Sequence, residues 1–85
     1  MYAETLISYE LLNHNQMLSL HITTILGEDA QLVIRVKFIT HLKKTFGSLT
    51  IMAGTVSLCY LRASDEKEVN KLNELYDTLM IKMQQ

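Results

Sequence analysis

The chain has no proline and no tryptophan, only three glycines, and a single cysteine among its 85 residues. Because Cys59 has no second cysteine to pair with, an internal disulfide is excluded, and so is the class of small secreted domains that disulfides hold together. A reducing compartment is the expectation, and we predict a cytoplasmic protein. The missing proline and scattered glycines favour regular elements joined by short turns.

An excess of charge of one sign is also missing. Eight Lys and Arg residues stand against nine Asp and Glu residues, which gives a formal net charge of −1. Proteins that bind nucleic acid or a membrane surface usually carry a clear basic excess, so composition argues against nucleic acid as a partner and predicts no membrane association. Stretch 1–12 contains no Lys or Arg and does not have the pattern of a secretory signal. The uncharged stretch 45–61 is shorter and more polar than a typical membrane span, which favours a buried core element.

Length predicts one domain over residues 1–85, because domains run from about 50 to 250 residues. Short breaks at residues 27–29, 47–48 and 63–65 divide the chain into four segments. The last segment is the clearest, since Asp65 and Glu68 have the spacing of a capping box at a helix start. Apolar side chains then recur at helical spacing, which predicts an amphipathic helix over residues 65–83.

The two central segments permit two interpretations. Asp29 as a cap and Gly47 as a left-handed terminator favour a helix over residues 29–46, although residues 32–38 also alternate like a strand. Residues 48–62 fit a mostly buried helix. They also fit strands 49–53 and 56–60 with a bulge at Gly54.

The first segment, residues 3–26, fits one long helix that ends at Gly27. The competing interpretation breaks it at residues 13–15 and makes residues 17–25 a strand. Because all four segments satisfy the helical period, we predict an all-α fold, a small bundle of about four helices with short turns. The alternative is an α+β fold with the order α-β-β-β-α.

A helical first segment aligns Glu10, His14 and His21 along the edge of its apolar side. Three explanations stay open: ordinary hydrogen-bonded side chains, a stripe that meets a partner chain, or a metal site. No Cys-x-x-Cys or His-Glu-x-x-His spacing supports a metal, so we predict no metal and no cofactor. Arg35 falls inside the apolar arc of the second segment. It either pairs with Glu10, within the chain or across a dimer, or extends to water along its aliphatic stem.

Catalysis is not expected, because the sequence has no nucleophile elbow and no glycine-rich phosphate loop. Cys59 lies in the most apolar stretch, where a thiol stays protonated and inert. We therefore predict no enzyme.

The predicted function is a non-catalytic protein–protein interaction module that docks apolar helix faces on a protein partner or on a second copy in a homodimer. Such a module is a regulator, adaptor, inhibitor or chaperone-type subunit. One alternative is a small α+β RNA-binding module, and another is a metal- or ligand-binding helical bundle. The predicted interaction residues are Leu72, Tyr76, Leu79, Met80 and Met83, together with Glu10, His14, His21 and Arg35.

Two short stretches, residues 59–65 and 68–71, resemble segments near the carboxyl end of the larger subunit in the Alu-domain heterodimer of the signal recognition particle. The resemblance implies an α-β-β-β-α fold that binds RNA through a basic sheet. The match needs a large gap between its two pieces, and the basic sheet residues of that family are missing here.

Overall fold

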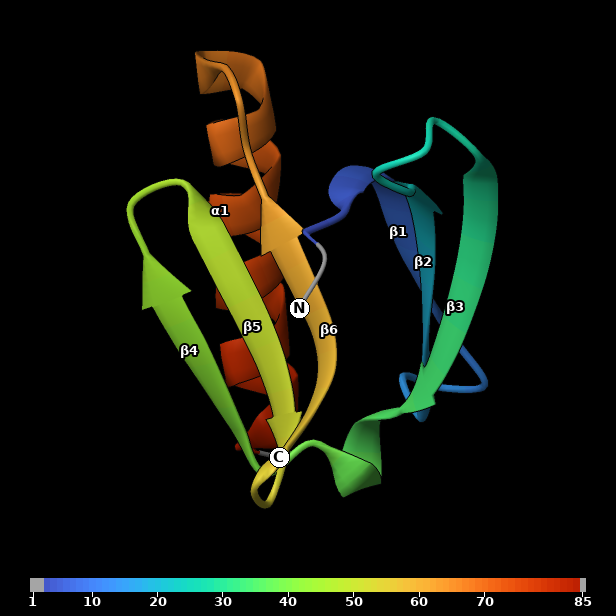
Figure 1. Cartoon of the computed structure of the whole chain (residues 1–85). Helices are drawn as coiled ribbons and strands as arrows, with labels where there is room; N and C mark the ends of the chain where they lie inside the picture. Colours follow the sequence, from blue (N-terminus) through green and yellow to red (C-terminus); the bar gives the residue numbers. More distant parts are fainter. Residues whose placement is uncertain (1–2, 85) are drawn as a thin grey trace.

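A computed structural model describes residues 3–84 and shows a mainly β fold with one carboxyl-terminal helix (Figure 1). The described elements are β1 (Thr5–Leu12), β2 (Met17–Thr23), β3 (Asp29–Arg35), the 3-10 turn η1 (Val36–Phe38), β4 (His41–Thr45), β5 (Ser48–Ala53), β6 (Val56–Arg62) and α1 (Glu66–Met83).

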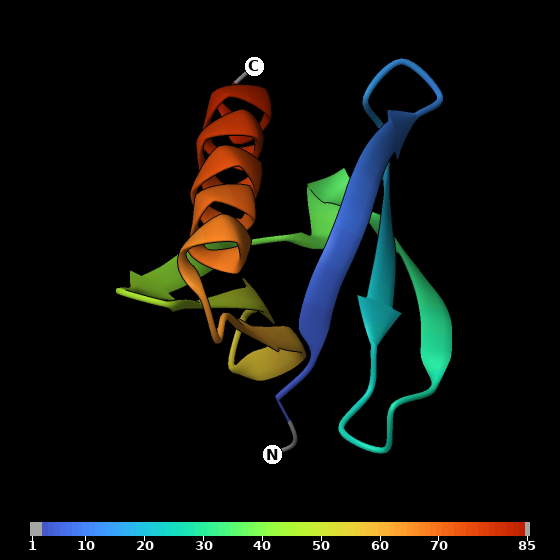
Figure 2. The ribbon, with the colours of Figure 1, turned by 90° about the horizontal axis from the view of Figure 1, so that it is seen from above.

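The strands form two antiparallel sheets of three, β1-β2-β3 and β4-β5-β6. The sheets meet at one end, where the Glu4 amide donates to the Tyr60 carbonyl (3.0 Å) and the Arg62 amide donates to the Glu4 carbonyl (2.9 Å). From that junction they diverge, and α1 packs against the inner face of β4-β5-β6 and beside β1 (Figure 2). The strands β3 and β4 are therefore the outer edges of the two sheets.

The core lies where the helix and the inner faces of both sheets meet. Leu72, Leu75 and Leu79 of α1 are buried there, as are apolar residues of every strand except β4. The side chains with the least exposure are Leu18, Leu20, Leu49, Ile51, Leu61, Leu75 and Leu79.

A set of polar contacts joins β1 to α1 at the margin of this core. The Tyr9 hydroxyl donates to Glu74 Oε1 (2.9 Å) and lies 3.2 Å from Thr78 Oγ1. Lys71 Nζ donates to the Ile7 carbonyl (3.0 Å). These bonds fix the helix along the first strand.

The turn between β1 and β2 has an unusual backbone. Asn13, His14 and Asn15 all have positive φ values, of 52°, 56° and 71°. Asn and His tolerate the left-handed region better than most residues, which explains why this tripeptide can reverse the chain without glycine. The break predicted at residues 13–15 is a tight turn.

The predicted all-α bundle is wrong, because the first three segments are strands rather than helices. Segment 3–26 holds β1 and β2, segment 29–46 holds β3 and β4, and segment 48–62 holds β5 and β6. The α-β-β-β-α alternative is closer, since it places a sheet before the last helix, but its first helix is also a strand. Gly47 has the predicted left-handed backbone, with φ of 83°, but in a turn between strands, and Gly27 has φ of 81° in another such turn instead of ending a helix.

Two β-bulges interrupt the strand alternation in the first and third segments, whereas the pairings of β3 and β4 in the second segment have none. Pairing of β1 with β2 shifts register between Leu6 and Ser8, so the inward side chains are Leu6, Tyr9 and Leu11. These inward residues are three and then two positions apart, whereas the inward residues of a regular strand are always two positions apart. The irregular spacing hides the strand pattern in the sequence. The second bulge lies between Ile51 and Met52 rather than at the predicted Gly54.

The last helix is confirmed. It spans Glu66–Met83, and the Asp65 side chain accepts a hydrogen bond from the Glu68 amide (2.8 Å). The Glu68 carboxylate in turn accepts from the Ser64 amide (2.8 Å), one residue before the position that a capping box requires.

Candidate functional site

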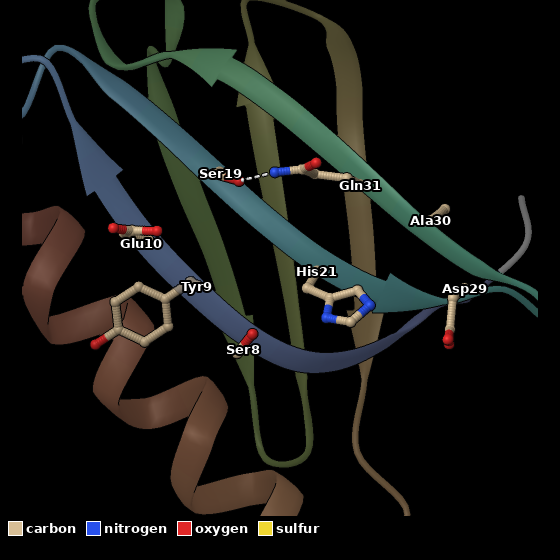
Figure 3. A pocket seen from close by; sticks show the side chains of 8 residues that line it. All are labelled: Ser8, Tyr9, Glu10, Ser19, His21, Asp29, Ala30 and Gln31. Carbon is tan, nitrogen blue, oxygen red and sulfur yellow. Dashed lines mark hydrogen bonds between the residues drawn. The ribbon is translucent and has the colours of Figure 1, made fainter.

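The outer face of β1-β2-β3, which points away from the core, carries a polar cleft of about 560 Å³ (Figure 3). Glu10 of β1 and His21 of β2 both line it, whereas the stripe was predicted along a single helix. Its lining residues are Ser8, Tyr9, Glu10, Ser19, His21, Asp29, Ala30 and Gln31.

A hydrogen bond joins two of the polar side chains that line this cleft. Gln31 Nε2 donates to Ser19 Oγ (2.7 Å), which satisfies a serine that is only 6% exposed. His21 lies between Ser8 and Asp29, the three residue types of a hydrolytic triad (Figure 3). Within residues 3–84 no hydrogen bond joins these three side chains.

A different kind of hollow lies where the β1–β2 turn, η1 and the last turn of α1 meet. This end groove has a volume of about 680 Å³ and is lined by three cationic side chains, Arg35, Lys37 and Lys82. No Asp or Glu lines it. Its remaining walls are amide, hydroxyl and apolar: Asn13, Asn15, Gln16, Met17, Val36, Ile39, Thr40 and Met83.

Lys37 and Ile39 line the end groove, and Phe38 lies between them in the chain without lining the groove itself. The Lys37 ammonium lies 5.5 Å from the centroid of the Phe38 ring, a cation–π distance. Phe38 is 56% exposed, so much of its ring is accessible to a ligand. An exposed aromatic ring beside cations is the combination that binds bases and phosphates together.

A shallower hollow of about 590 Å³ covers the outer face of β4-β5-β6, the face opposite to α1. It is also free of acidic lining residues. Its lining residues are Lys43, Thr45, Ser48, Thr50, Met52, Thr55, Ser57 and Tyr60. The two hollows are neighbours, because Thr40 lines the end groove and its amide donates to the carbonyl of Met52 (2.9 Å).

A charge asymmetry in the sequence underlies both surfaces. Residues 30–64 contain no Asp or Glu but hold five of the eight basic residues, Arg35, Lys37, Lys43, Lys44 and Arg62. The nine acidic residues all lie outside this stretch, so the net charge of −1 conceals a basic middle and acidic flanks. Counting charge by segment rather than over the whole chain is the signal that would have found the end groove.

The predicted docking face of α1 is used within the chain. Leu72 and Leu79 are buried in the core, whereas Tyr76, Met80 and Met83 are half-buried at its margins. Lys44 Nζ lies 5.4 Å from the centroid of the Tyr76 ring. Met83 is the one member of this set that lines the end groove. A docking role for these five residues stays a prediction.

The other predicted interaction residues do not form one stripe. His14 lies in the β1–β2 turn, while Glu10 and His21 line the polar cleft. Arg35 is exposed at the end of β3 instead of lying in an apolar arc. Across the part of the chain that the structure describes, Arg35 has no ion-pair partner, so the pairing with Glu10 within the chain is not formed.

Cys59 is 3% exposed, as its apolar surroundings predicted. Burial raises the pKa of its thiol to about 12, and the negative charge of Glu4 adds to the shift. The thiol is therefore protonated at neutral pH.

Among residues 3–84, no cluster of three or more His, Cys, Asp or Glu side chains has the proximity to hold a metal ion, and no helix has the length and apolar character to cross a membrane. Comparisons with protein-family models, with curated proteins and with solved structures find no match.

Proposed function

We propose that this protein is a small α+β module that binds single-stranded RNA along two adjoining hollows that no acidic residue lines, the end groove and the hollow on the outer face of β4-β5-β6. We call these two hollows together the acid-free surface. The observation that carries the proposal is the end groove, where Arg35, Lys37 and Lys82 gather without an acidic neighbour in the lining. Phosphate contacts from Lys and Arg supply most of the affinity for a nucleic-acid backbone, and an acid in the groove would oppose them.

The rest of the groove suits bases rather than phosphates alone. The side-chain amides of Asn13, Asn15 and Gln16 each offer a donor and an acceptor to a base edge. Phe38 offers an exposed ring on which a base can stack. Single-stranded RNA exposes both features, whereas the bases of a duplex are already paired and stacked.

The neighbouring outer face of β4-β5-β6 gives the strand a path beyond the groove. Lys43 and Tyr60 lie on either side of Thr50 in register across this sheet, so one row presents a cation, a hydroxyl and a phenol ring. In this arrangement phosphates follow the cations from Lys82 and Lys37 to Lys43, and bases face the amide and aromatic side chains.

Fluorescence anisotropy of a labelled single-stranded RNA of about twelve nucleotides tests the proposal, because single-strand sites usually cover about 4 to 16 nucleotides. We expect micromolar or tighter binding at low salt that weakens severalfold in Lys37→Ala and in Lys82→Ala. Lys67→Ala is the matched control, since Lys67 is exposed on α1 and lines none of the hollows described above.

Absence of RNA binding at low salt would overturn the proposal. So would an equal loss of RNA affinity in Lys37→Ala, Lys82→Ala and Lys67→Ala. Equal affinity for a DNA strand of the same sequence would assign the groove to single-stranded nucleic acid in general and would contradict the choice of RNA.

A further inference from the structure

The strand β3 is an unpaired sheet edge with a self-complementary sequence. It pairs only with β2, and its other side faces away from the rest of the described chain (Figure 2). An exposed edge of this kind is a template for another strand, because its backbone donors and acceptors have no partner in the sheet. The length of β3, seven residues from Asp29 to Arg35, is enough for a full ladder.

We propose that β3 pairs with β3 of a second copy, antiparallel and about a two-fold axis centred on Leu32. In that register Asp29 lies opposite Arg35 of the second copy, and the two-fold symmetry repeats this pair at the other end. Leu32 lies opposite its own counterpart. This interface makes a continuous six-stranded sheet from two copies and does not depend on RNA binding.

The faces of the strand agree with this register. Asp29, Val33 and Arg35 are exposed on the outer face, so both charge pairs form on the same side of the joined sheet. On the inner face, Leu32 is half-buried in one copy and would be covered by Leu32 of the second. Val33, which is 48% exposed, lies opposite Gln31 of the second copy.

Other registers lose these pairs. A shift by one residue places the outer side chains of one strand opposite the inner side chains of the other. A shift by two residues keeps the faces but separates Asp29 from Arg35. Only the register centred on Leu32 combines full overlap with two opposite-charge pairs.

The other edge strand is protected against the same pairing. The centre of β4 is Lys43, so self-pairing of β4 would bring two lysines directly opposite each other. Lysine on an edge strand is a common device against association, and β3 has none. In the β3 dimer Arg35 is engaged by Asp29 of the second copy, and the end groove retains Lys37 and Lys82 for its ligand.

Sedimentation equilibrium from about 1 μM to about 1 mM tests the pairing, since this range covers weak to moderate dimers. We expect a monomer–dimer equilibrium in the wild type. Asp29→Arg and Arg35→Asp each turn both attractive pairs into repulsive ones, and we expect each variant alone to dimerise at least about tenfold more weakly.

An equimolar mixture of the two variants separates pairing from a folding defect. In the mixed dimer, the arginine introduced at position 29 of one chain meets the aspartate introduced at position 35 of the other. At the other end of the ladder the unchanged Arg35 and Asp29 meet, so both attractive pairs return. We expect the mixture and the double variant Asp29→Arg/Arg35→Asp to dimerise like the wild type. Lys43→Glu, on the other edge, is the matched control and should not change dimerisation.

A wild type that stays monomeric up to the highest concentration overturns the proposal. So does a dimer that Asp29→Arg and Arg35→Asp leave intact, because its interface then lies elsewhere. Failure of the mixture to associate, with both variants folded by circular dichroism, also contradicts the pairing.

Discussion

The Tyr9 hydroxyl donates a hydrogen bond of 2.9 Å to Glu74 Oε1 and so ties the first strand to the last helix across 65 residues of sequence. Both residues lie where β1 and α1 pack together, at the margin of the core. The bond therefore holds together β1 and α1, the first and last elements of the described fold.

Removing this bond should lower stability. We expect Tyr9→Phe and Glu74→Ala, which lack the donor and the acceptor respectively, each to reduce the free energy of unfolding by about 1 kcal/mol, the usual net contribution of a side-chain hydrogen bond. The double variant should lose less than the sum of the two, since both single changes remove the same bond. Urea denaturation of the four proteins measures the coupling, and strict additivity would show that the two groups do not interact.

The inward face of α1 should behave as core and its outward face as surface. Leu79 is fully buried, so Leu79→Ala should destabilise the protein by about 2 to 5 kcal/mol. Ile81, two residues away and 59% exposed, is the matched control and should change stability by no more than about 0.5 kcal/mol when replaced by alanine. Comparable losses in the two variants would contradict the orientation of the helix.

The buried thiol of Cys59 should make stability fall at alkaline pH. Burial raises its pKa from 9.0 to about 12 in the folded chain, so the folded state holds a proton that the unfolded state releases. The stability that this provides is complete below about pH 9 and is lost as pH rises toward about 12. Cys59→Ala should therefore have a flatter unfolding free energy over this window than the wild type, and parallel pH profiles would contradict the assignment.

The exposed ring of Phe38 should contribute to RNA affinity without contributing charge. Base–aromatic stacking supplies about 1 to 3 kcal/mol per base, so Phe38→Ala should weaken binding by about 5- to 150-fold. Phe46, 94% exposed in the β4–β5 turn, is the matched control because, unlike Phe38, it is not flanked in the chain by two residues that line the end groove. Equal effects of Phe38→Ala and Phe46→Ala on RNA affinity in the anisotropy titration would exclude a stacking role for Phe38.

The sequence predicts the last helix because its local signals agree: Asp65 caps the first turn and the apolar residues keep one period throughout. In β1 a bulge interrupts the strand alternation between Leu6 and Ser8, whereas β3 alternates without a bulge and its strand pattern competed with helix caps at Asp29 and Gly47. Such a bulge is set by pairing with β2, a contact that local periodicity does not report.

The end groove escaped prediction for a similar reason. Arg35 and Lys37 are close in sequence, but Lys82 reaches them only because the end of α1 lies beside η1. The sequence does contain one usable signal, the absence of acids from residues 30–64, which the overall net charge hides. The self-complementary order of charges in β3 becomes meaningful only once β3 is known to be an edge.

The salt dependence of RNA affinity is the most direct test of the claim that RNA phosphates bind the cations of the end groove. A plot of log affinity against log salt concentration should be linear for the wild type, and loss of one phosphate contact should make its slope shallower by about 0.7. We expect that change in Lys37→Ala and in Lys82→Ala, and the wild-type slope in Lys67→Ala. Binding that does not respond to salt, or slopes that are the same in all four proteins, would contradict RNA binding through the end groove.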